Sequence, residues 1–486
     1  MSKRSRIVKP ENKQEKMKKV FILMCLAVGL LSCAKEIAPQ EETKGVPMTF
    51  EFSVDGQTKA SKTAWTDIDV IYVFFKGLET KHLMLTYDSA TQKWTPSVLP
   101  GDASLTDEDF DGLTEHTLTA VYLPTPVYVT TDTPGQFTIT CDGEKPFYGF
   151  YLFQEGQAYE IDGTTVKAGL SLEKPADFVQ IHIPCDPTEV GGTFGCRLIR
   201  PVACAGVGVD GKVVEKELQA GARLNAISDA DGLLFAGRLT SPGTAADYTF
   251  TFATDAEIYT LLRDSKTLEP GKQYNFPALT TIGPDDWNKT AAEDLYVDLG
   301  LSVKWAKCNL GAATETDYGD YFAWGETIGY NEGKTDFVWS TYLFDNSASH
   351  DGSSFSKYTG SDFDTLKPED DAAYAALGGK FRMPTSAEID ILRGLRKEWV
   401  NNYNGSGIKG YKFTGSNGNT LFLPAAGYRD GTNLVVAGSI GYYWSSSLYG
   451  GSLKYAWHLL FITGGGCDTE GNSRYCGCPV RPVYSD

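Results

Sequence analysis

The sequence is poor in the residues from which most catalytic and metal centres are built. It has five histidines in 486 residues, none in an H-E-x-x-H arrangement, and no G-x-S-x-G nucleophile elbow. No two of its ten cysteines form a C-x-x-C pair, the usual spacing of a structural zinc site. The formal net charge of −18 argues against nucleic acid as a partner, because phosphates attract basic surfaces. These absences favour a binding or structural protein, with no metal or cofactor, over an enzyme.

The apolar run near the N-terminus is short. It extends from Val20 to Gly29 after Lys18 and Lys19, whereas a membrane-spanning helix needs about 20 apolar residues. A basic head, an apolar core and a small residue describe an export signal. The next residues, Leu30-Leu31-Ser32-Cys33, resemble the signal of bacterial lipoproteins. The resemblance implies diacylglycerol on Cys33, cleavage before it and anchoring in outer-membrane lipid. A plain secretory signal with an incidental cysteine is the alternative.

We therefore expect residues 1–32 to be a signal peptide, with Met17 as the true start. Residues 33–45 have almost no apolar content and are expected to form a lipidated, solvated tether. The roughly 450 residues that follow the signal are enough for about three domains. The 26 tyrosines and 51 glycines favour short strands and tight turns over long helices.

Short alternating segments fill residues 46–284. Phe50, Phe52 and Val54 alternate with polar residues, which is the period-2 pattern of a half-buried strand. Similar segments follow at regular spacing, separated by Asp, Gly, Pro and Thr clusters, as is typical of β-sandwiches. The pattern predicts an all-β fold with one sandwich at 46–174 and a second at 175–284. One or two helical turns are expected at 255–264.

Four segments of this region resemble the fimbrillin family of Bacteroidales surface proteins over about residues 45–285. They are Lys62–Trp65, Asp69–Phe74, Leu83–Tyr87 and Leu268–Phe276. The family implies two stacked β-sandwiches, lipid-anchored export, and assembly with other fimbrillins into pili or surface adhesins by strand donation. Strand donation has a physical basis, since an edge strand with unpaired backbone groups accepts another strand.

The chain departs from this family in one respect. Shaft subunits of the family are thought to mature by cleavage after an arginine in the first sandwich, but this chain has no arginine between Arg6 and Arg197. Either a lysine such as Lys59 or Lys62 takes that place, or the protein stays anchored and never polymerises as a shaft. We favour the second interpretation.

The last part of the chain has a different pattern of expected secondary structure. After a polar linker at 285–294, residues 295–486 combine short aromatic strands with two helices, as in an α+β module. One helix is expected to begin at Pro368 and to end before Gly378. The other begins after Thr385, which forms a capping box with Glu388. The apolar face of this second helix is expected to carry Ile389, Leu392, Leu395 and Trp399.

This module resembles the Fibrobacter major paralogous domain family, itself similar to C-type-lectin-like folds. The segments that carry the resemblance are Gly300–Ala306, Asn309–Ala312, Tyr318–Glu326, Leu377–Thr385, Leu423–Arg429, Tyr443–Ser447 and Val480–Val483. The family implies no general activity. The Glu-Pro-Asn, Gln-Pro-Asp and Trp-Asn-Asp motifs of calcium-dependent lectins do not occur in the module, so calcium-dependent sugar binding does not carry over.

Some patterns mimic functional sites and are better explained as surface or core. Asp107, Asp109 and Asp111 open like a calcium loop, but the twelfth position is Leu118 where a glutamate is needed. The stretch 329–335 is one residue short of a phosphate loop. Large aromatics carry much of the burial in a small core. The residues expected in or beside the core of the module are Trp305, Trp324, Trp444 and His458.

The candidate binding residues of the module flank glycine-rich loops and belong to types that are enriched at recognition surfaces. They are Tyr428, Arg429, Tyr449 and Tyr475. A disulfide between Cys467 and Cys476 would close the loop at Gly464–Gly466. Cys476 and Cys478 also invite comparison with sulfatase-activating enzymes, which share the lectin-like fold and use C-terminal cysteines.

These observations predict a lipid-anchored protein of the outer-membrane surface, in which two sandwiches present a recognition module to glycans or proteins. Its expected function is adhesion or ligand capture. One alternative is a pilus subunit at a tip or base. The other is an extracytoplasmic enzyme of the sulfatase-activating or glycosidase type, since two carboxylates distant in sequence can meet in space.

Overall fold

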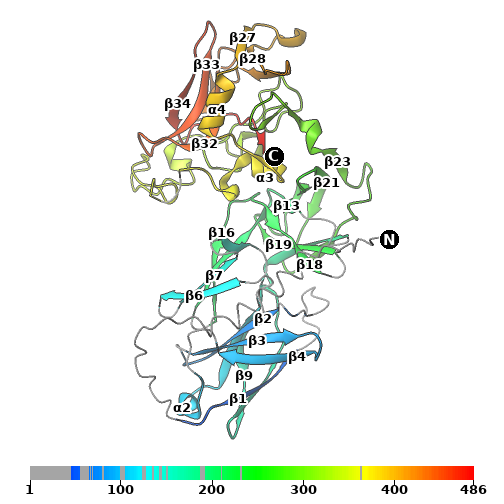
Figure 1. The fold of residues 1–486 in the computed structure, drawn as a ribbon, viewed down its shortest axis with the longest axis vertical. Coiled ribbons are helices and arrows are strands. Elements are labelled where there is room, and N and C mark those ends of the chain that lie inside the picture. The colour runs from blue at the N-terminus through cyan, green and yellow to red at the C-terminus, as the bar shows by residue number, and fades with distance from the viewer. Residues whose placement is uncertain are drawn as a thin grey trace, which may run out of the picture.

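This computed structural model describes residues 45–54, 65, 67, 69–78, 81–98, 104–122, 127–133, 136–141, 145–148, 151–185, 192–208, 211–229, 232–361 and 364–485. Most of them form strands in several sheets, with few helices, which confirms the predicted fold class. Three parts follow one another along the longest axis (Figure 1). No helix within these ranges is long and apolar enough to cross a membrane. Cys33, the expected signal and nearly all of the expected tether lie outside the described residues.

The first part is a sandwich of two sheets. The larger has the order β4 (Lys93–Val98), β3 (His82–Asp88), β2 (Val70–Phe75), β5 (Thr117–Tyr122) and β9 (Leu152–Ala158). The smaller has the order β1 (Thr49–Val54), β11 (Thr165–Leu170) and β10 (Glu160–Asp162), with β1 parallel to β11. The central strand β2 reads as a continuous apolar run because both of its faces are covered. The short helix α2 (Asp107–Phe110) adds Phe110 to the core.

A further sheet joins the first part to the second. Its order is β16 (Val213–Glu217), β15 (Val202–Gly208), β8 (Lys145–Tyr148), β7 (Gln136–Cys141) and β6 (Val127–Thr133). It unites strands from both sides of the predicted boundary at 174/175. The first core also contains Phe178 and Val207 from beyond that boundary. The two expected sandwiches therefore share a sheet and part of a core.

The second part has two sheets of its own. One has the order β14 (Ile199–Arg200), β19 (Gly232–Leu239), β12 (Phe178–Pro184) and β22 (Gln273–Asn275), with β18 (Ile227–Asp229) beside β19. The other has the order β17 (Leu224–Asn225), β13 (Thr193–Gly195), β20 (Ala245–Ala253), β21 (Glu257–Thr267) and β23 (Asn288–Ala291). Aromatic rings fill the space between them. The Phe194 and Phe235 centroids lie 5.0 Å apart, and those of Phe250 and Phe276 lie 4.7 Å apart.

Two local predictions differ from the structure here. Residues 255–264, expected as helical turns, lie mostly in β21, because β20 and β23 supply backbone partners on both of its sides. Residues 285–294, expected as a polar linker, contain β23 and the fully buried Trp287. The indole of Trp287 donates to the carbonyl oxygen of Pro277 at 2.9 Å. The polar residues around Trp287 led to the prediction of a linker, but the segment forms a strand and adds a tryptophan to the second core.

The C-terminal module is built from small sheets and short helices. The first sheet has the order β24 (Tyr296–Val297), β25 (Lys304–Ala306), β35 (Val483–Tyr484) and β26 (Phe381–Arg382), and the second has the order β27 (Arg396–Val400), β28 (Gly410–Thr414) and β29 (Thr420–Pro424). A two-stranded sheet pairs β30 (Tyr428–Asp430) with β31 (Asn433–Val435). The last sheet has the order β32 (Ile440–Leu448), β33 (Tyr455–Ile462) and β34 (Cys467–Ser473). Because β35 pairs with β25, the last strand of the chain closes onto the start of the module. The 3₁₀ turns are η1 (Ala292–Leu295), η2 (Tyr330–Glu332), η3 (Trp339–Thr341), η4 (Pro368–Asp370) and η5 (Tyr403–Gly405).

The predicted helices of the module are present but short. After η4, α3 (Ala372–Leu377) is capped by Asp371 and ends at Gly378. α4 (Ser386–Arg393) has the predicted capping box, in which Thr385 accepts from the Glu388 amide. The helix stops at Gly394, so Trp399 lies on β27 and not on the expected helical face. Three predicted core aromatics, Trp305, Trp324 and Trp444, are at most 1% exposed, which confirms that prediction.

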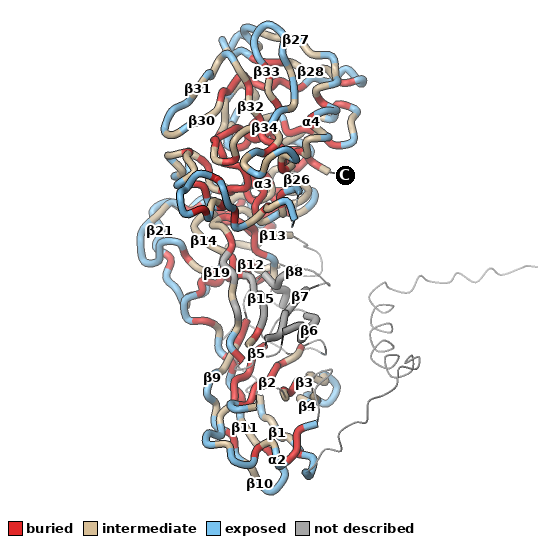
Figure 2. The backbone as a smooth tube through the Cα atoms, turned by 90° about the vertical axis from the view of Figure 1, so that its left-hand side faces the viewer, coloured by how far each residue is buried: buried red, intermediate tan, exposed pale blue. Residues whose placement is uncertain are grey.

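The module is joined to the second part through partly buried polar contacts. α3 lies directly beyond β13 in both views (Figures 1 and 2). Gln219 donates to the carbonyl oxygen of Gly325 and to a carboxylate oxygen of Asp370, both at 2.7 Å. The hydroxyl of Tyr484 donates to the carbonyl oxygen of Asp255 at 2.7 Å. These contacts hold the module in a defined position on the second part.

Candidate functional site

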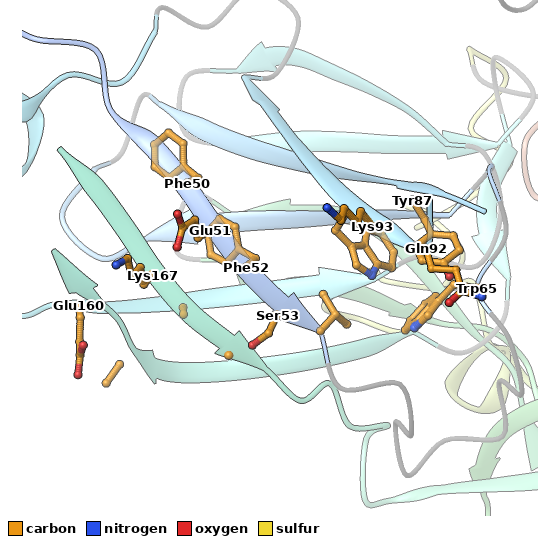
Figure 3. Close-up of a pocket in the computed structure, with 15 residues that line it drawn as sticks. Phe50, Glu51, Phe52, Ser53, Trp65, Tyr87, Gln92, Lys93, Glu160 and Lys167 are labelled. Atoms are coloured by element: carbon orange, nitrogen blue, oxygen red, sulfur yellow. The ribbon is translucent and has the colours of Figure 1, made fainter. Parts of the chain in front are cut away.

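An open groove lies along one edge of the first sandwich. It has a volume of about 970 Å³ and is bordered by β1 and by the end of β4 near Lys93 and Trp94 (Figure 3). Phe50, Phe52 and Val54 are half-buried because they alternate toward the core, while the residues between them face solvent. Among the described residues, β1 pairs only with β11, and β4 only with β3. Each strand therefore keeps one edge at which no described strand pairs.

Aromatic residues form one end of the groove. The ring centroids of Trp65 and Trp94 lie 5.1 Å apart in an edge-to-face arrangement, and Tyr87 lies 5.2 Å from Trp94. Trp65 also contacts Tyr122, whose hydroxyl donates to the buried carboxylate of Asp69 at 2.7 Å. Burial, and then the nearby Asp69 charge, raise the pKa of Tyr122 far above its usual range. This end of the groove is apolar, aromatic and fixed by a buried hydrogen bond.

Charged groups of both signs lie along the groove. Lys93 and Gln92 lie at the aromatic end, and Glu160 and Lys167 lie at the other end (Figure 3). A groove beside two strand edges that combines aromatic, polar and charged side chains is suited to an extended peptide. Such a peptide would add backbone hydrogen bonds to an edge and place alternate side chains in the groove.

Three of the four binding residues predicted in the module are close along the backbone, because Arg429 forms a bridge with Gly477, two residues after Tyr475, but their side chains have different neighbours. The Arg429 guanidinium carbon lies 3.2 Å from the ring centroid of Tyr330, which is a close stacking contact. Tyr428 lies 4.6 Å from Tyr442 by ring centroid, and the acidity of its phenol is weakened because burial raises its pKa. Tyr475 lies 4.9 Å from Trp339. All three predicted residues are half-buried and packed against neighbours.

Tyr449 lies on the opposite face of the sheet. Its ring centroid is 4.5 Å from that of Trp457, whereas Tyr442 stacks on His458 at 5.2 Å. Trp457 and His458 are consecutive in β33, so their side chains point to opposite faces. Tyr449 is therefore separated from Tyr428 by the sheet, and the four predicted residues do not form one surface. His458, expected in or beside the core, is 2% exposed and lies in the core.

The predicted disulfide between Cys467 and Cys476 is absent, and both residues are free thiols. Cys467 begins the seven-residue strand β34, and Cys476 follows its end. A strand of that length spans about 23 Å, whereas bridged cysteines have Cα atoms within about 7 Å of each other. Closure of the glycine loop is achieved instead by the β33–β34 pairing, in which Phe461 faces Cys467.

The two cysteines compared with those of sulfatase-activating enzymes are buried. Burial raises the pKa of Cys476 to about 12 and holds the pKa of Cys478 well above its usual value. Both thiols are therefore protonated at neutral pH, and the thiol is a poor nucleophile compared with the thiolate. An amide proton of Asn472 is directed at the Cys478 sulfur at 3.6 Å. The burial of Cys476 and Cys478 indicates that the two side chains contribute to packing in the core of the module.

The other patterns that mimic sites take part in local structure. Asp109 accepts from Lys81 and from the Thr106 amide, both at 2.7 Å, and so anchors α2. Lys334, in the stretch that resembles a phosphate loop, forms an ion pair with the buried Glu326 at 2.7 Å. Within the described part of the chain, no group of three or more His, Cys, Asp or Glu residues is placed to hold a metal ion.

Comparison with known proteins gives distant structural similarities. No protein-family model and no curated protein matches the chain. A candidate cell adhesion protein from Bacteroides fragilis is 12% identical, with 52% of this chain and 92% of that chain covered, at a TM-score of 0.25. The fimbrial anchor protein of Porphyromonas gingivalis is 13% identical, with 42% and 78% covered, at a TM-score of 0.21. A fimbrial protein from Bacteroides ovatus is 10% identical, with 91% and 99% covered, at a TM-score of 0.21.

Proposed function

We propose that this protein is an adhesin of the bacterial cell surface, anchored by lipid at Cys33, with the C-terminal module as its recognition head. The proposal depends on where the start of the first sandwich and the C-terminal module lie in the molecule. Val46 and Pro47 contact the start of α2, which lies at the end of the molecule opposite to β33 and β34 (Figure 1). An anchor that precedes Gly45 would hold the first sandwich near the membrane and present the module outward.

The segment between the proposed anchor and the fold has a suitable length and chemistry. Cys33 and Gly45 are separated by 12 residues (45 − 33), which span at most about 43 Å when extended. Their polar composition favours a solvated tether. Diacylglycerol on Cys33 would supply two acyl chains, and two membrane signals are what stable anchoring requires. The tether would leave the molecule free to reorient while the anchor holds.

Metabolic labelling with palmitate tests the anchor. Label is expected on the wild type and on Cys25→Ala, which removes the other cysteine near the signal, but not on Cys33→Ala. Protease added to intact cells is expected to remove the protein, because the head is outside the cell. An unlabelled wild type that is protected from protease would contradict the proposal. Adhesion of wild-type cells that exceeds adhesion of a deletion strain would support the binding function.

A second function, that of a pilus subunit at a tip or base, is favoured by the groove of the first sandwich. Phe50, Phe52 and Trp94 leave apolar surface open beside two strand edges. An extended segment of another subunit could complete this sandwich. The proposed contact would resemble the pairing of β11 with β1, which already runs parallel.

Gel mobility tests this second function. Unboiled samples of a polymerising subunit show a ladder, and Phe52→Lys is expected to abolish the ladder by placing a charge in the groove. Ser97→Lys, on the exposed side of β4, is the matched control and should keep it. A wild type that runs as a single band would exclude polymerisation and leave the anchored adhesin.

A further inference from the structure

A second hollow lies in the C-terminal module, away from the groove of the first sandwich. It has a volume of about 560 Å³ and lies between the loop at 352–359 and the turn at 452–454. Among the described residues that line it, those with hydroxyls are Ser353, Ser354, Thr359 and Ser452, those with apolar side chains are Phe355 and Leu453, and the charged one is Lys454. The hollow therefore combines several groups that can both donate and accept hydrogen bonds with a small apolar surface.

A buried arginine fixes both walls of the hollow. Arg474 is fully buried, and its guanidinium donates to the carbonyl oxygens of Tyr358 at 3.2 Å and Lys357 at 3.1 Å in one wall. It donates to the carbonyl oxygen of Leu453 at 3.2 Å in the other wall. The same guanidinium lies 4.2 Å above the ring of Phe355. The walls are thus preorganised, which lowers the entropic cost of binding a ligand between them.

Aromatic side chains extend from the same turn. Tyr449 and Tyr455 flank it, and the Tyr449 ring packs on Trp457. The eight-residue helix α4 packs on Leu459 and Phe461, which share this face of β33, but is about 12 Å long and cannot cover the whole strand. The end of the face at Tyr455 and Trp457 is therefore left to these aromatic rings, and Tyr455 is 38% exposed.

The charge of this region selects for a neutral ligand. The ammonium of Lys454 donates to the carbonyl oxygen of Asp351 at 2.8 Å, so this cation is directed toward the loop backbone. The chain as a whole carries a formal charge of −18, which repels anions. A sugar has hydroxyls for the serine and threonine side chains and a C–H face for an aromatic ring.

We propose that this hollow, with the ring of Phe355 in its lining and the ring of Tyr455 next to the turn at 452–454, binds a neutral glycan without calcium. The inference depends on the proposed function, because it names the ligand class of the recognition head. Of the four predicted binding residues, Tyr475 is next to this hollow, because Trp339 packs on both Tyr475 and Phe355. The hydroxyls of Ser353 and Ser452 would fix the orientation of the sugar, and the rings would supply contact area.

An array of neutral, sialylated and sulfated glycans tests the proposal on the full chain in mild detergent, with a chelator present. Neutral glycans are expected to bind preferentially. Tyr455→Ala, and separately the double change Ser353→Ala with Ser452→Ala, are expected to raise the half-saturating concentration about tenfold. Leu434→Ala, an exposed residue of β31, is the control and should bind as the wild type does. Unchanged melting temperatures would show that the variants are folded.

Three outcomes would overturn the inference. They are a preference for anionic glycans, equal binding by all variants, and no binding to any neutral glycan while cells that carry the protein still adhere. The last result would leave the adhesin proposal standing and exclude only the glycan. A wild type that shows neither adhesion nor glycan binding would contradict the adhesin proposal itself.

Discussion

The guanidinium of Arg223, in the second part, donates from Nη1 to the carbonyl oxygen of Ala375, in α3 of the C-terminal module, at 3.1 Å. Arg223 is 6% exposed and also donates to the side chain and carbonyl oxygen of Thr193 at 2.6 Å. Burial lowers the pKa of Arg223 to about 10, which still leaves it charged at neutral pH. A buried cation thus joins the end of a helix in one part to a strand in another.

Substitution of Arg223 is expected to loosen the module from the second part. Arg223→Ala removes hydrogen bonds to buried oxygens, each of which costs about 1–3 kcal/mol when left unsatisfied. In calorimetry the variant should unfold at a lower temperature, with the module separating as an earlier transition. Arg263→Ala is the control, because the Arg263 guanidinium donates to the neighbouring carbonyl of Leu262 within β21. A single unshifted transition in Arg223→Ala would show that the contact does not couple the parts.

His458 is expected to make a contribution to the stability of the module that is lost as pH falls below neutrality. Burial lowers the pKa of His458 to about 4 from 6.5. Between these values the unfolded chain binds a proton that the folded chain does not, so acidification favours unfolding. The loss between pH 6.5 and pH 4 amounts to about 3 kcal/mol, since one pKa unit corresponds to about 1.4 kcal/mol. Above pH 6.5 the contribution is constant.

Urea unfolding of wild type and His458→Phe at several pH values would measure this effect. Phenylalanine can keep the stack on Tyr442 and the edge contact with Trp444, and it cannot take up a proton. Carboxylates such as Asp371, whose pKa burial raises to about 6, titrate in the same way in both proteins and cancel in the difference. Identical pH profiles for the two proteins would contradict the assignment to His458.

The stability of the first sandwich at the aromatic end of the groove is expected to depend on the buried hydrogen bond between Tyr122 and Asp69. Tyr122→Phe removes the donor and leaves the Asp69 carboxylate short of one partner, at a cost of about 1–3 kcal/mol. Asp69→Asn keeps an acceptor for the tyrosine and should cost less. Chemical denaturation of the single and double variants would give the coupling energy. Additive effects would mean that the pair contributes no specific stabilisation.

The features of the fold that sequence could predict are those encoded by nearby residues. Thr385 and Glu388 are three residues apart, so the start of α4 was accessible from the capping-box pattern alone. Alternation in Phe50, Phe52 and Val54 predicted β1 in the same way. The three core tryptophans followed from size and apolarity. In each case the physical cause acts within a few residues of the chain.

The features that sequence could not predict depend on distant pairing. β7 pairs with β15 across the predicted boundary, and no local pattern in Phe137 or Val207 names that partner. Gln219 and Arg223 look like ordinary surface residues until the module packs on them. Among the candidate binding residues, Tyr449 packs on Trp457, whereas Tyr428 contacts Tyr442, which stacks on His458. Trp457 and His458 are adjacent in β33 and point to opposite faces, so Tyr449 and Tyr428 lie on opposite sides of the sheet. Composition could suggest residue types for a site but not which of them meet.

The cysteines of the module are expected to remain separate thiols. Cys467 is half-buried at the start of β34, while Cys476 and Cys478 are buried beyond its end. Alkylation of the native protein without reductant should modify Cys467 faster than the other two, because access and thiolate fraction both fall on burial. After denaturation all three should be alkylated, as mass spectrometry of the peptides would show. A peptide that links Cys467 to Cys476 would contradict the structure, since β34 would have to bend or unpair from β33 for the two sulfurs to meet.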